Sequence, residues 1–185
     1  MDTDETKTDK IDNTNENGGL KIDYDPKKAH YLVVTGIVVR DGKFLITKRA
    51  SHEPAFPGKW TIPGGKFEAD DYLQREKDTE ALWYNIFNDS LRREIREEVN
   101  FEIKNIRYLT DMVYVRSDGI PTVIISLFAE YHDGDVELCK DLDEHAWVTL
   151  EEARDYDFID GIYEELEMLD LYLKQGELGE WKRSG

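Results

Sequence analysis

The stretch Leu91-Arg92-Arg93-Glu94-Ile95-Arg96-Glu97-Glu98-Val99-Asn100-Phe101 decides the fold of this chain. At about 100° per residue it reads as an amphipathic helix. Its apolar side chains share one stripe, and they are Leu91, Ile95 and Val99. Its carboxylates fall within an arc of about 100° beside that stripe, and they are Glu94, Glu97 and Glu98. The helix is therefore expected to pack on a core and to present three acids together.

Three carboxylates this close repel one another. Each pair at ~4 Å costs roughly 1 kcal/mol in water and about 4 kcal/mol at an effective dielectric of 20. A divalent cation would turn that repulsion into binding, and hard oxygen ligands suit Mg²⁺ or Mn²⁺. The alternative is a solvated face whose charge Arg92, Arg93 and Arg96 offset through i,i+3 and i,i+4 pairs. The helix alone leaves both interpretations open.

A paired-glycine turn precedes the helix. Pro63-Gly64-Gly65-Lys66-Phe67-Glu68 ends a strand-like run, Trp60-Thr61-Ile62. Paired glycines let the backbone turn sharply and approach a ligand. Together, turn and helix resemble the signature of the Nudix hydrolase family, G-x5-E-x7-R-E-U-x-E-E-x-G-U, in which U is apolar. Gly65 matches its first glycine, and the run from Arg93 to Phe101 matches its second half in order and spacing.

Three features depart from that signature. Its first glutamate falls on Asp71, a shorter acid, and its last glycine falls on Asn100. Asparagine also tolerates the left-handed conformation that ends a helix, so the cap can survive. Between Asp71 and Arg93 lie 21 residues where the family has seven, an insertion of 14. Because a helix can be extended backwards without moving its carboxylates, we expect turn and helix still to meet in space.

The resemblance implies a hydrolase that cleaves the diphosphate linkage of a nucleoside di- or triphosphate derivative, with Mg²⁺ or Mn²⁺ as its cofactor. Metal ions neutralise phosphate oxygens, orient the bridge and lower the pKa of bound water. The implied metal ligands are Glu97, Glu98 and the carbonyl of Gly64. Glu94 is a third ligand or the general base. Arg93 lies four residues before Glu97 and would hold it in position.

Other candidate site residues lie in loops. Arg49 falls where the family often places a basic residue toward substrate, although it could equally be a surface arginine. Lys59 could touch a phosphate, and Gly65 would approach the substrate through its backbone. His52 sits in a loop containing Pro54, Pro57 and Gly58, where a lone histidine is more often a bystander than a ligand.

The loop before Trp147 offers a further acid. The resemblance implies that a metal ligand or general base comes from this loop. Glu144 is favoured because its longer side chain spans the gap to a helix-bound metal more easily, and Asp141 is the second choice. The alternative is that the loop acids, including Asp143, are all solvated and that the base is Glu94.

The remaining pattern mixes strands with helices. Tyr31–Arg40 and Lys43–Arg49 read as a hairpin across Asp41-Gly42. Further strands are expected at residues 103–110, 112–116, 122–131 and 146–149, and helices at 150–155 and 163–173. Regular βαβ alternation is missing. This order agrees with the fold that the resemblance implies, an α/β protein with a Nudix-type α/β/α sandwich, a mixed sheet and an inserted helical segment.

The insertion, residues 72–90, is predicted to be ordered and helical from about Thr79. It either continues into the signature helix or stops where Asn88-Asp89-Ser90 caps a fresh start. Phe87 would share the buried stripe. Other apolar residues lie off that stripe, so the segment calls for a second partner, either another part of this chain or a second subunit in a homodimer. These off-stripe residues are Leu82, Trp83 and Ile86.

Composition restricts the partners and the compartment. The chain has 185 residues and a net charge of −17. That charge argues against nonspecific nucleic-acid binding and against anionic membrane surfaces, but a phosphate substrate remains compatible because metal ions supply positive charge locally. Cys139 is the single cysteine, which fits a reducing compartment, and we expect a cytoplasmic protein. Residues 1–21 read as a disordered acidic tail, and residues 22–185 as a single domain.

Two other classes of protein share the implied fold. One is a nucleotide sensor that binds without cleaving; the insertion makes this possible, although sensors often lose glutamates that are kept here. The other is an isomerase of the isopentenyl diphosphate type, which needs an active-site cysteine, and Cys139 is poorly placed for that role. The signature does not identify the substrate, and our default is a nucleoside triphosphate or a modified nucleotide.

Overall fold

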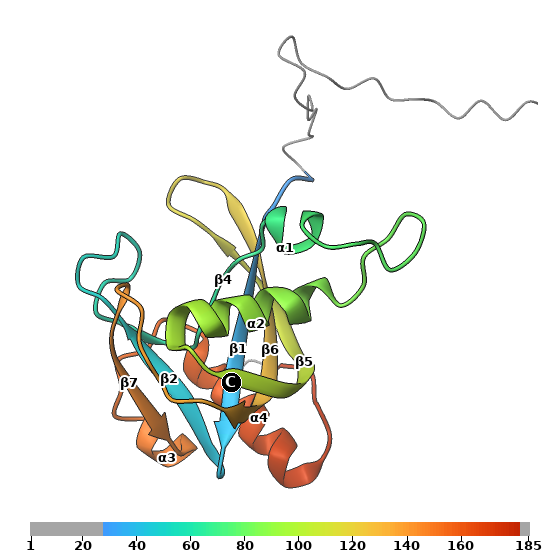
Figure 1. The fold of residues 1–185 in the computed structure, drawn as a ribbon. Coiled ribbons are helices and arrows are strands. Elements are labelled where there is room, and N and C mark those ends of the chain that lie inside the picture. The colour runs from blue at the N-terminus through green and yellow to red at the C-terminus, as the bar shows by residue number, and fades with distance from the viewer. Residues whose placement is uncertain (1–27, 182–185) are drawn as a thin grey trace, which may run out of the picture. The chain divides into compact units, whose positions relative to one another are not determined.

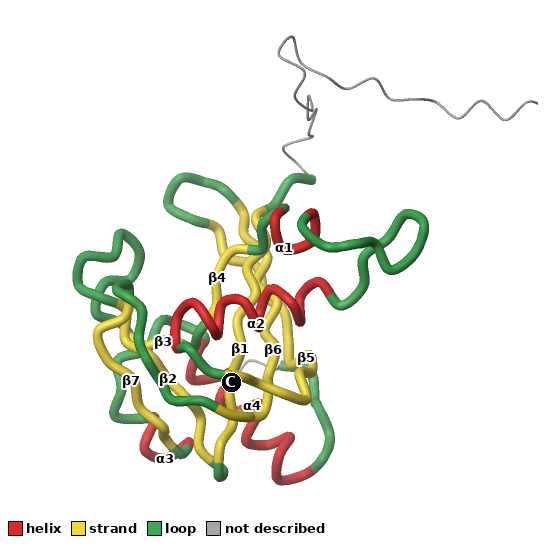
Figure 2. Tube along the Cα trace, viewed as in Figure 1, coloured by secondary structure: helices red, strands yellow, loops and turns green. Residues whose placement is uncertain are grey.

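The computed structural model describes residues 28–181, and its compact unit begins at Tyr31. The predicted tail, residues 1–21, lies outside the described residues. Figures 1 and 2 show the arrangement of the elements. In chain order they are β1 (Tyr31–Arg40), β2 (Lys43–Arg49), β3 (Trp60–Thr61), β4 (Gly64–Lys66), α1 (Asp70–Leu73), α2 (Ile86–Val99), β5 (Glu102–Val115), β6 (Pro121–Asp133), β7 (Leu142–Val148), α3 (Leu150–Ala153) and α4 (Ile162–Gln175).

The strands form one mixed sheet. Its neighbours run in the order β3-β2-β1-β6-β5, with β4 paired to β1 and β7 paired to β2. β1 and β6 are parallel, and the other pairs are antiparallel. β1 and β2 pair beside their turn, at Val39 and Phe44, whereas β4 lies beside the first half of β1, with Gly64 opposite Thr35. The Gly-Gly turn is thus built into the sheet where β1 and β2 part.

Side-chain alternation along the strands divides the core into two layers. Val34, Val38 and Leu45 pack with α2 on one face of the sheet. Ile37 and Phe44 pack with α4 on the other face, and Figure 1 shows α2 and α4 on opposite sides of the strands. The predicted α/β/α sandwich with a mixed sheet is confirmed.

Helix α2 has the predicted amphipathic character. Leu91, Ile95 and Val99 are fully buried, so the apolar stripe faces the core. Asn100 takes the left-handed conformation, with φ 57°, and its amide donates to the Ile95 carbonyl at 2.9 Å. The asparagine therefore ends the helix as a glycine would.

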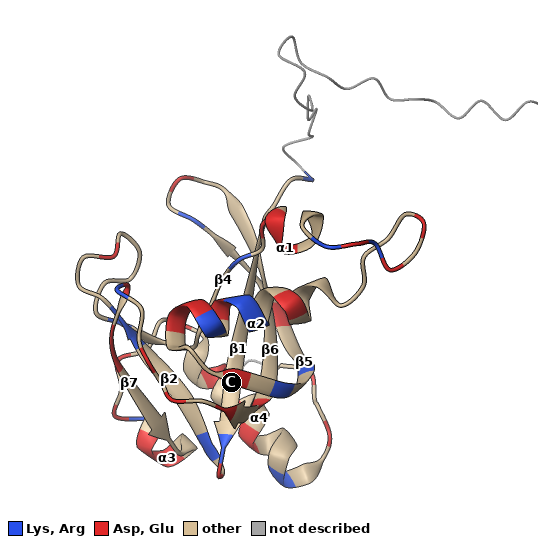
Figure 3. Ribbon diagram, viewed as in Figure 1, with Lys and Arg blue, Asp and Glu red and all other residues tan. Residues whose placement is uncertain are grey.

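The surface of the described domain is strongly charged. Figure 3 shows acidic and basic residues following one another along the ribbon of α2. Within residues 28–181, no helix is both long and apolar enough to cross a bilayer. The cytoplasmic location, the absence of nucleic-acid partners and the homodimer stay predictions.

The prediction of a helix from about Thr79 is wrong. α1 ends at Leu73, residues 74–85 are not helical, and α2 begins at Ile86. Asn85, just before α2, has a left-handed backbone with φ 56°. The structure therefore contains neither one long helix through the insertion nor a fresh start at residues 88–90.

Local hydrogen bonds of polar side chains explain the difference. The Asp78 carboxylate accepts the Tyr84 amide at 2.8 Å, and the Thr79 hydroxyl accepts the Leu82 amide at 3.1 Å. Side chains that bond nearby backbone amides compete directly with the helix for those amides. Leu82 and Tyr84 are each 54% exposed, so no other part of the described chain covers these two large side chains.

A row of aromatic rings ties the insertion to the sheet instead. Phe87 meets Phe67 edge to face with ring centroids 5.5 Å apart, and Phe67 stacks on Tyr72 at 5.8 Å. Tyr72 in turn contacts Trp83 at 5.2 Å, and the Trp83 indole donates to the Arg75 carbonyl at 3.2 Å. The insertion is ordered as predicted, through ring contacts rather than through a helix.

Phe87 tests this packing. Because its side chain is half-buried, we expect Phe87→Ala to lower the free energy of unfolding by about 1–3 kcal/mol, less than the 3–5 kcal/mol of a fully buried phenylalanine. Urea denaturation measures the loss. Leu82→Ala is the matched control in the same segment and should stay within about 0.5 kcal/mol of wild type. A neutral Phe87→Ala would contradict the ring contacts.

Glu165 in α4 is a buried acid on the face of the sheet opposite α2. Its side chain accepts a hydrogen bond from the Ser126 hydroxyl, and the residue is 4% exposed. Burial raises the pKa of Glu165 from 4.5 to about 7, the Ser126 bond opposes the rise, and the Glu164 charge adds to it. Folding therefore favours the protonated acid. This stability is fully present below about pH 4.5 and is lost as the pH rises through about 7.

Glu165→Gln should remove that pH dependence, because the amide stays neutral. The variant should match wild type near about pH 4 and be more stable by up to about 3 kcal/mol near about pH 8, at 1.36 kcal/mol per pKa unit. Urea unfolding at the two pH values measures the difference. Equal stability differences at both would show that Glu165 ionises normally in the fold.

Candidate active site

The Gly-Gly turn and α2 meet despite the insertion between them. The Gly64 amide donates to Glu98 Oε2 at 3.0 Å. A Cβ built on Gly65 would lie 2.3 Å from Glu94 Oε1, so a side chain there would displace the carboxylate. Gly65 is thus required by close approach of the turn to Glu94, whereas Gly64 is required by its close approach to β1, where a Cβ would lie 2.4 Å from the Val34 carbonyl oxygen.

Arg93 ties the helix to the turn and to the start of the insertion. Its Nε donates to Asp71 Oδ1 at 2.5 Å, and its Nη2 donates to the Lys66 carbonyl at 3.2 Å. Its Nη1 lies 2.8 Å from Glu94 Oε1 and donates to Glu97 Oε2 at 2.9 Å. The shorter acid at position 71 therefore still reaches the arginine, and Arg93 holds two of the helix acids.

Burial and mutual repulsion shift the pKa values of the acids at this site. Burial raises the pKa of Glu98 to about 7; the Gly64 amide opposes the rise and the Glu94 charge adds to it. Burial also raises the pKa of Glu94, against the pull of Arg93. For Asp71, burial alone would raise the pKa, but the Arg93 hydrogen bond and others hold it below its ordinary value. Glu94 and Glu98 are thus crowded acids that a nearby cation would ionise.

The donors at the turn fit a divalent cation. Glu98 lies at the Gly64 amide, Glu94 and Glu97 both lie at Arg93 Nη1, and the ligand atoms that these three side chains offer are carboxylate oxygens. Hard cations such as Mg²⁺ or Mn²⁺ take such oxygens. Burial raises the pKa values of Glu94 and Glu98, and the positive charge of a bound cation would lower them again.

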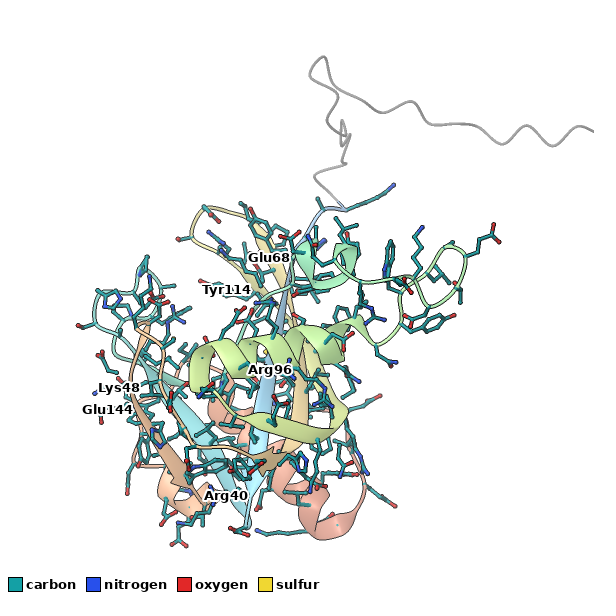
Figure 4. The ribbon with its side chains drawn as sticks, in the orientation of Figure 1. Arg40, Lys48, Glu68, Arg96, Tyr114 and Glu144 are labelled. Carbon is teal, nitrogen blue, oxygen red and sulfur yellow. The ribbon has the colours of Figure 1, made fainter. Side chains whose placement is uncertain are left out.

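The structure does not bring Glu144 to these carboxylates. Glu144 shares its strand face with Ala146, which packs under α4 rather than α2. Its Oε1 lies 2.6 Å from Lys48 Nζ, and Figure 4 shows the two side chains together at the outer edge of the domain. Asp141 is the loop acid near the helix, because its charge contributes to the raised pKa of Glu98.

The two basic candidates have different surroundings. Arg49 donates to Glu53 Oε2 at 2.5 Å, and its charge acts to lower the pKa of Glu98, so it lies beside the helix acids. Lys59 Nζ lies 2.5 Å from Asp157 Oδ1. Arg49 is therefore placed to face a phosphate, whereas Lys59 is engaged by an acid of the α3–α4 connection.

A cavity of about 510 Å³ opens beside Arg93 and Glu97. The insertion and the segment before it supply most of its wall, so they border the site directly. Sequence reasoning identified Asp71 as the residue at the signature's first acid but did not assign the other wall acids to the site, although the acid-rich segment before the insertion was a signal. Those other acids are Glu68, Asp70 and Asp89.

Two residues lie closer to the helix than the sequence suggested. His52 Nε2 is 3.6 Å from Asp141 Oδ1, so the histidine stands at the loop acid that neighbours Glu98. Cys139 donates its amide to the Glu98 carbonyl at 2.9 Å, and burial raises the pKa of its thiol. No sequence pattern places either residue here, since each is brought in by the pairing of β2 with β7.

Comparisons with known proteins agree with this geometry. A model of the NUDIX domain matches residues 30–166. The nucleoside triphosphatase NudI of Klebsiella pneumoniae (strain 342) is 25% identical over 135 residues, covering 68% of this chain and 86% of that protein.

Solved structures show the same fold. A NUDIX hydrolase from Alicyclobacillus acidocaldarius superimposes with a TM-score of 0.64 at 15% identity, covering 82% of this chain and 99% of that one. The NUDIX domain of Shewanella oneidensis NrtR, solved with ADP ribose, superimposes with a TM-score of 0.61 at 19% identity, covering 81% and 94%. With its signature helix set against the Gly-Gly turn and a family match over most of its length, the chain belongs to the NUDIX family.

Proposed function

We propose that this chain is a metal-dependent hydrolase that cleaves the diphosphate linkage of a nucleoside di- or triphosphate derivative. Family membership supports hydrolysis of such a bond in general, and the NudI relatives are named as nucleoside triphosphatases. The observation that supports the finer proposal is that Glu98 lies at Gly64 and Glu94 at Gly65, while Arg93 Nη1 contacts both Glu94 and Glu97. A diphosphate is polyanionic, so an acidic site can take it only together with cations.

The proposed roles are those that the resemblance to the signature implies. Glu97, Glu98 and the Gly64 carbonyl would hold Mg²⁺ or Mn²⁺, with Glu94 as a third ligand or the base. A bound cation supplies charge neutralisation at phosphate oxygens and a lower pKa for its water. Arg93 orients Glu97 at 2.9 Å and is a positioning residue.

The loops complete the proposed site. Asp141 is the loop acid that we assign to it, in place of Glu144, because its charge acts on Glu98. Arg49 would contact a phosphate after exchanging its contact with Glu53, which lies 2.5 Å away. Arg49 ends β2 and Asp141 lies just before β7, so the sheet holds both residues.

A nucleotide panel tests the function. The full chain is incubated with Mg²⁺ and nucleoside triphosphates, nucleoside diphosphate sugars, ADP-ribose and a prenyl diphosphate, and the products are separated by ion exchange. We expect at least one nucleotide to yield a monophosphate product, and no turnover after chelation. Tight binding of a nucleotide without turnover would indicate a sensor, and an isomerised prenyl diphosphate would indicate an isomerase; either result overturns the proposal.

A further inference from the structure

We propose that the base of the nucleotide substrate stacks between Phe56 and Tyr114, two aromatic side chains that meet from distant parts of the chain. Phe56 lies in the β2–β3 loop, residues 50–59, and Tyr114 lies near the end of β5. Their ring centroids are 6.1 Å apart, and the rings are tilted by 54°. Each residue is 42% exposed, so a ligand can reach the pair from solvent. This base site rests on the proposed function, because it binds the part of the substrate that the carboxylates leave free.

Phe56 is held in a backbone conformation that bulky residues avoid. Its φ is 53°, in the left-handed region, where a side chain as large as phenylalanine is strained. The loop imposes this conformation through its hydrogen bonds: the Lys59 amide donates to the Phe56 carbonyl at 3.2 Å, and the Gly58 amide donates to the Arg49 carbonyl at 3.1 Å. Backbone strain that the surrounding structure maintains is typical of ligand sites. Since the Phe56 side chain is not buried, packing alone does not explain why a phenylalanine occupies this position.

The loop also places Phe56 beside the arginine that we assign to the phosphates. Arg49 Nε donates to the Ala55 carbonyl at 2.7 Å. Because that carbonyl belongs to the peptide bond between Ala55 and Phe56, the Phe56 Cα lies within about 6 Å of Arg49 Nε. The charge of Arg49 in turn acts on Glu98. A nucleotide whose phosphates lie at Arg49 and the carboxylates of α2 can therefore bring its base to the Phe56 ring.

A buried hydroxyl without a partner lies next to the second ring. Thr122 stands directly opposite Tyr114 in the β5–β6 pairing, so the two side chains are neighbours on one face of the sheet. Thr122 is 5% exposed, and its Oγ1 has no hydrogen-bond partner within residues 28–181. Stacked rings lie ~3.5 Å apart, so a base between two parallel rings needs centroids ~7 Å apart, about 1 Å more than this pair has. Parting the rings by that amount would let the polar edge of the base bond the hydroxyl.

The chemistry of the three groups fits a nucleobase. Two aromatic faces take a flat ring, and every base has such a face. The Thr122 hydroxyl can both donate and accept a hydrogen bond, so it can pair with either an amino or a keto group of the base. We therefore expect the site to bind more than one base.

Nucleotide binding without turnover tests the base site. Isothermal titration of the full chain with Mg²⁺ measures the affinity for methylene-bridged nucleoside diphosphates of the four bases. Methylenediphosphonate is the matched probe that lacks the nucleoside. We expect Phe56→Gly and Tyr114→Ala to bind the preferred nucleotide about 5- to 150-fold more weakly, as when a base loses an aromatic partner. Both variants should bind methylenediphosphonate as wild type does.

Two further variants serve as controls for the ring. Tyr114→Phe keeps the aromatic face and should bind the nucleotide as wild type does. Tyr108→Ala removes another exposed aromatic side chain from β5, on the opposite face of the strand, where Tyr108 pairs with Leu127 of the α2 layer. It should also keep the wild-type affinity, since that face lies away from Tyr114.

Unfolding of Phe56→Gly separates a role in binding from a role in packing. Glycine adopts a φ of 53° without strain, so we expect the urea midpoint of this variant to equal or exceed that of wild type. Unchanged nucleotide affinity in both Phe56→Gly and Tyr114→Ala would overturn the base site. So would wild-type binding of methylenediphosphonate that is as tight as that of every nucleotide. Because turnover is not read out, a chain that binds nucleotides through these rings without cleaving them would keep the base site and overturn only the hydrolase.

Discussion

Glu97→Gln is expected to lower kcat by more than about 10²-fold and to leave the fold intact. Loss of a residue that only supports a metal ligand typically costs 10–100-fold, and Glu97 is proposed as a ligand itself. Its side chain is 58% exposed and is bound by Arg93, so the amide opens no cavity. Steady-state hydrolysis with Mg²⁺ and urea unfolding measure the two effects.

Glu137→Gln is the control for the change of charge, because the Glu137 side chain is exposed and only its backbone amide contacts α2, at the Val99 carbonyl. It should hydrolyse at the wild-type rate. If Glu97→Gln hydrolysed every tested nucleotide as fast as wild type, the assignment of the metal to the helix carboxylates would be wrong.

The second large effect concerns the loop before Trp147. Asp141→Asn should lower kcat about 10²–10⁴-fold and remove the acidic limb of the pH profile, as expected when a general base is lost. Glu144→Gln should keep both the rate and the profile, because Glu144 pairs with Lys48 on the other face of β7. The measurement is kcat against pH for these variants and for Asp143→Asn.

The outcome also locates the base. If Asp141→Asn keeps the wild-type rate and pH profile, the loop has no catalytic part and the base is on the helix, at Glu94. If Glu144→Gln alone loses the acidic limb, Glu144 is the base. The assignment of Asp141, which rests on the orientation of Glu144 away from α2, would then be wrong.

The signature helix could be predicted because its information is local. The 3.6-residue period placed Leu91, Ile95 and Val99 on the buried stripe, and the left-handed tolerance of asparagine placed the helix end at Asn100. The hairpin across Asp41-Gly42 is local in the same way, with positive φ at both residues.

The insertion was harder because its apolar residues suggested a longer helix. The side chains of Asp78 and Thr79 accept hydrogen bonds from backbone amides that a helix would need. Phe67, which lies outside the insertion, packs against both Phe87 and Tyr72. Aromatic contacts between two separate segments of the chain follow no helical or strand repeat, so the spacing of residues in the sequence does not predict them.

The loop acids show why register matters. Glu144 lies opposite Lys48, and a bulge between Lys48 and Arg49 shifts the pairing before Asp141. Because one residue of slip turns a side chain to the opposite face, side-chain length alone does not decide which of these acids faces α2. The loop with His52 meets Asp141 where β2 pairs with β7, so no sequence spacing predicts this contact.

The central claim is that water attacks phosphorus at a metal held by the carboxylates of α2. Turnover in ¹⁸O-labelled water tests it most directly. The best substrate of the nucleotide panel is converted with Mg²⁺, and the products are analysed by mass spectrometry and ³¹P NMR. We predict one ¹⁸O atom in one of the two phosphate products, and no products after chelation or with Glu97→Gln. Products without ¹⁸O on phosphorus, or turnover that survives both chelation and Glu97→Gln, would contradict a metal-dependent hydrolase built on α2.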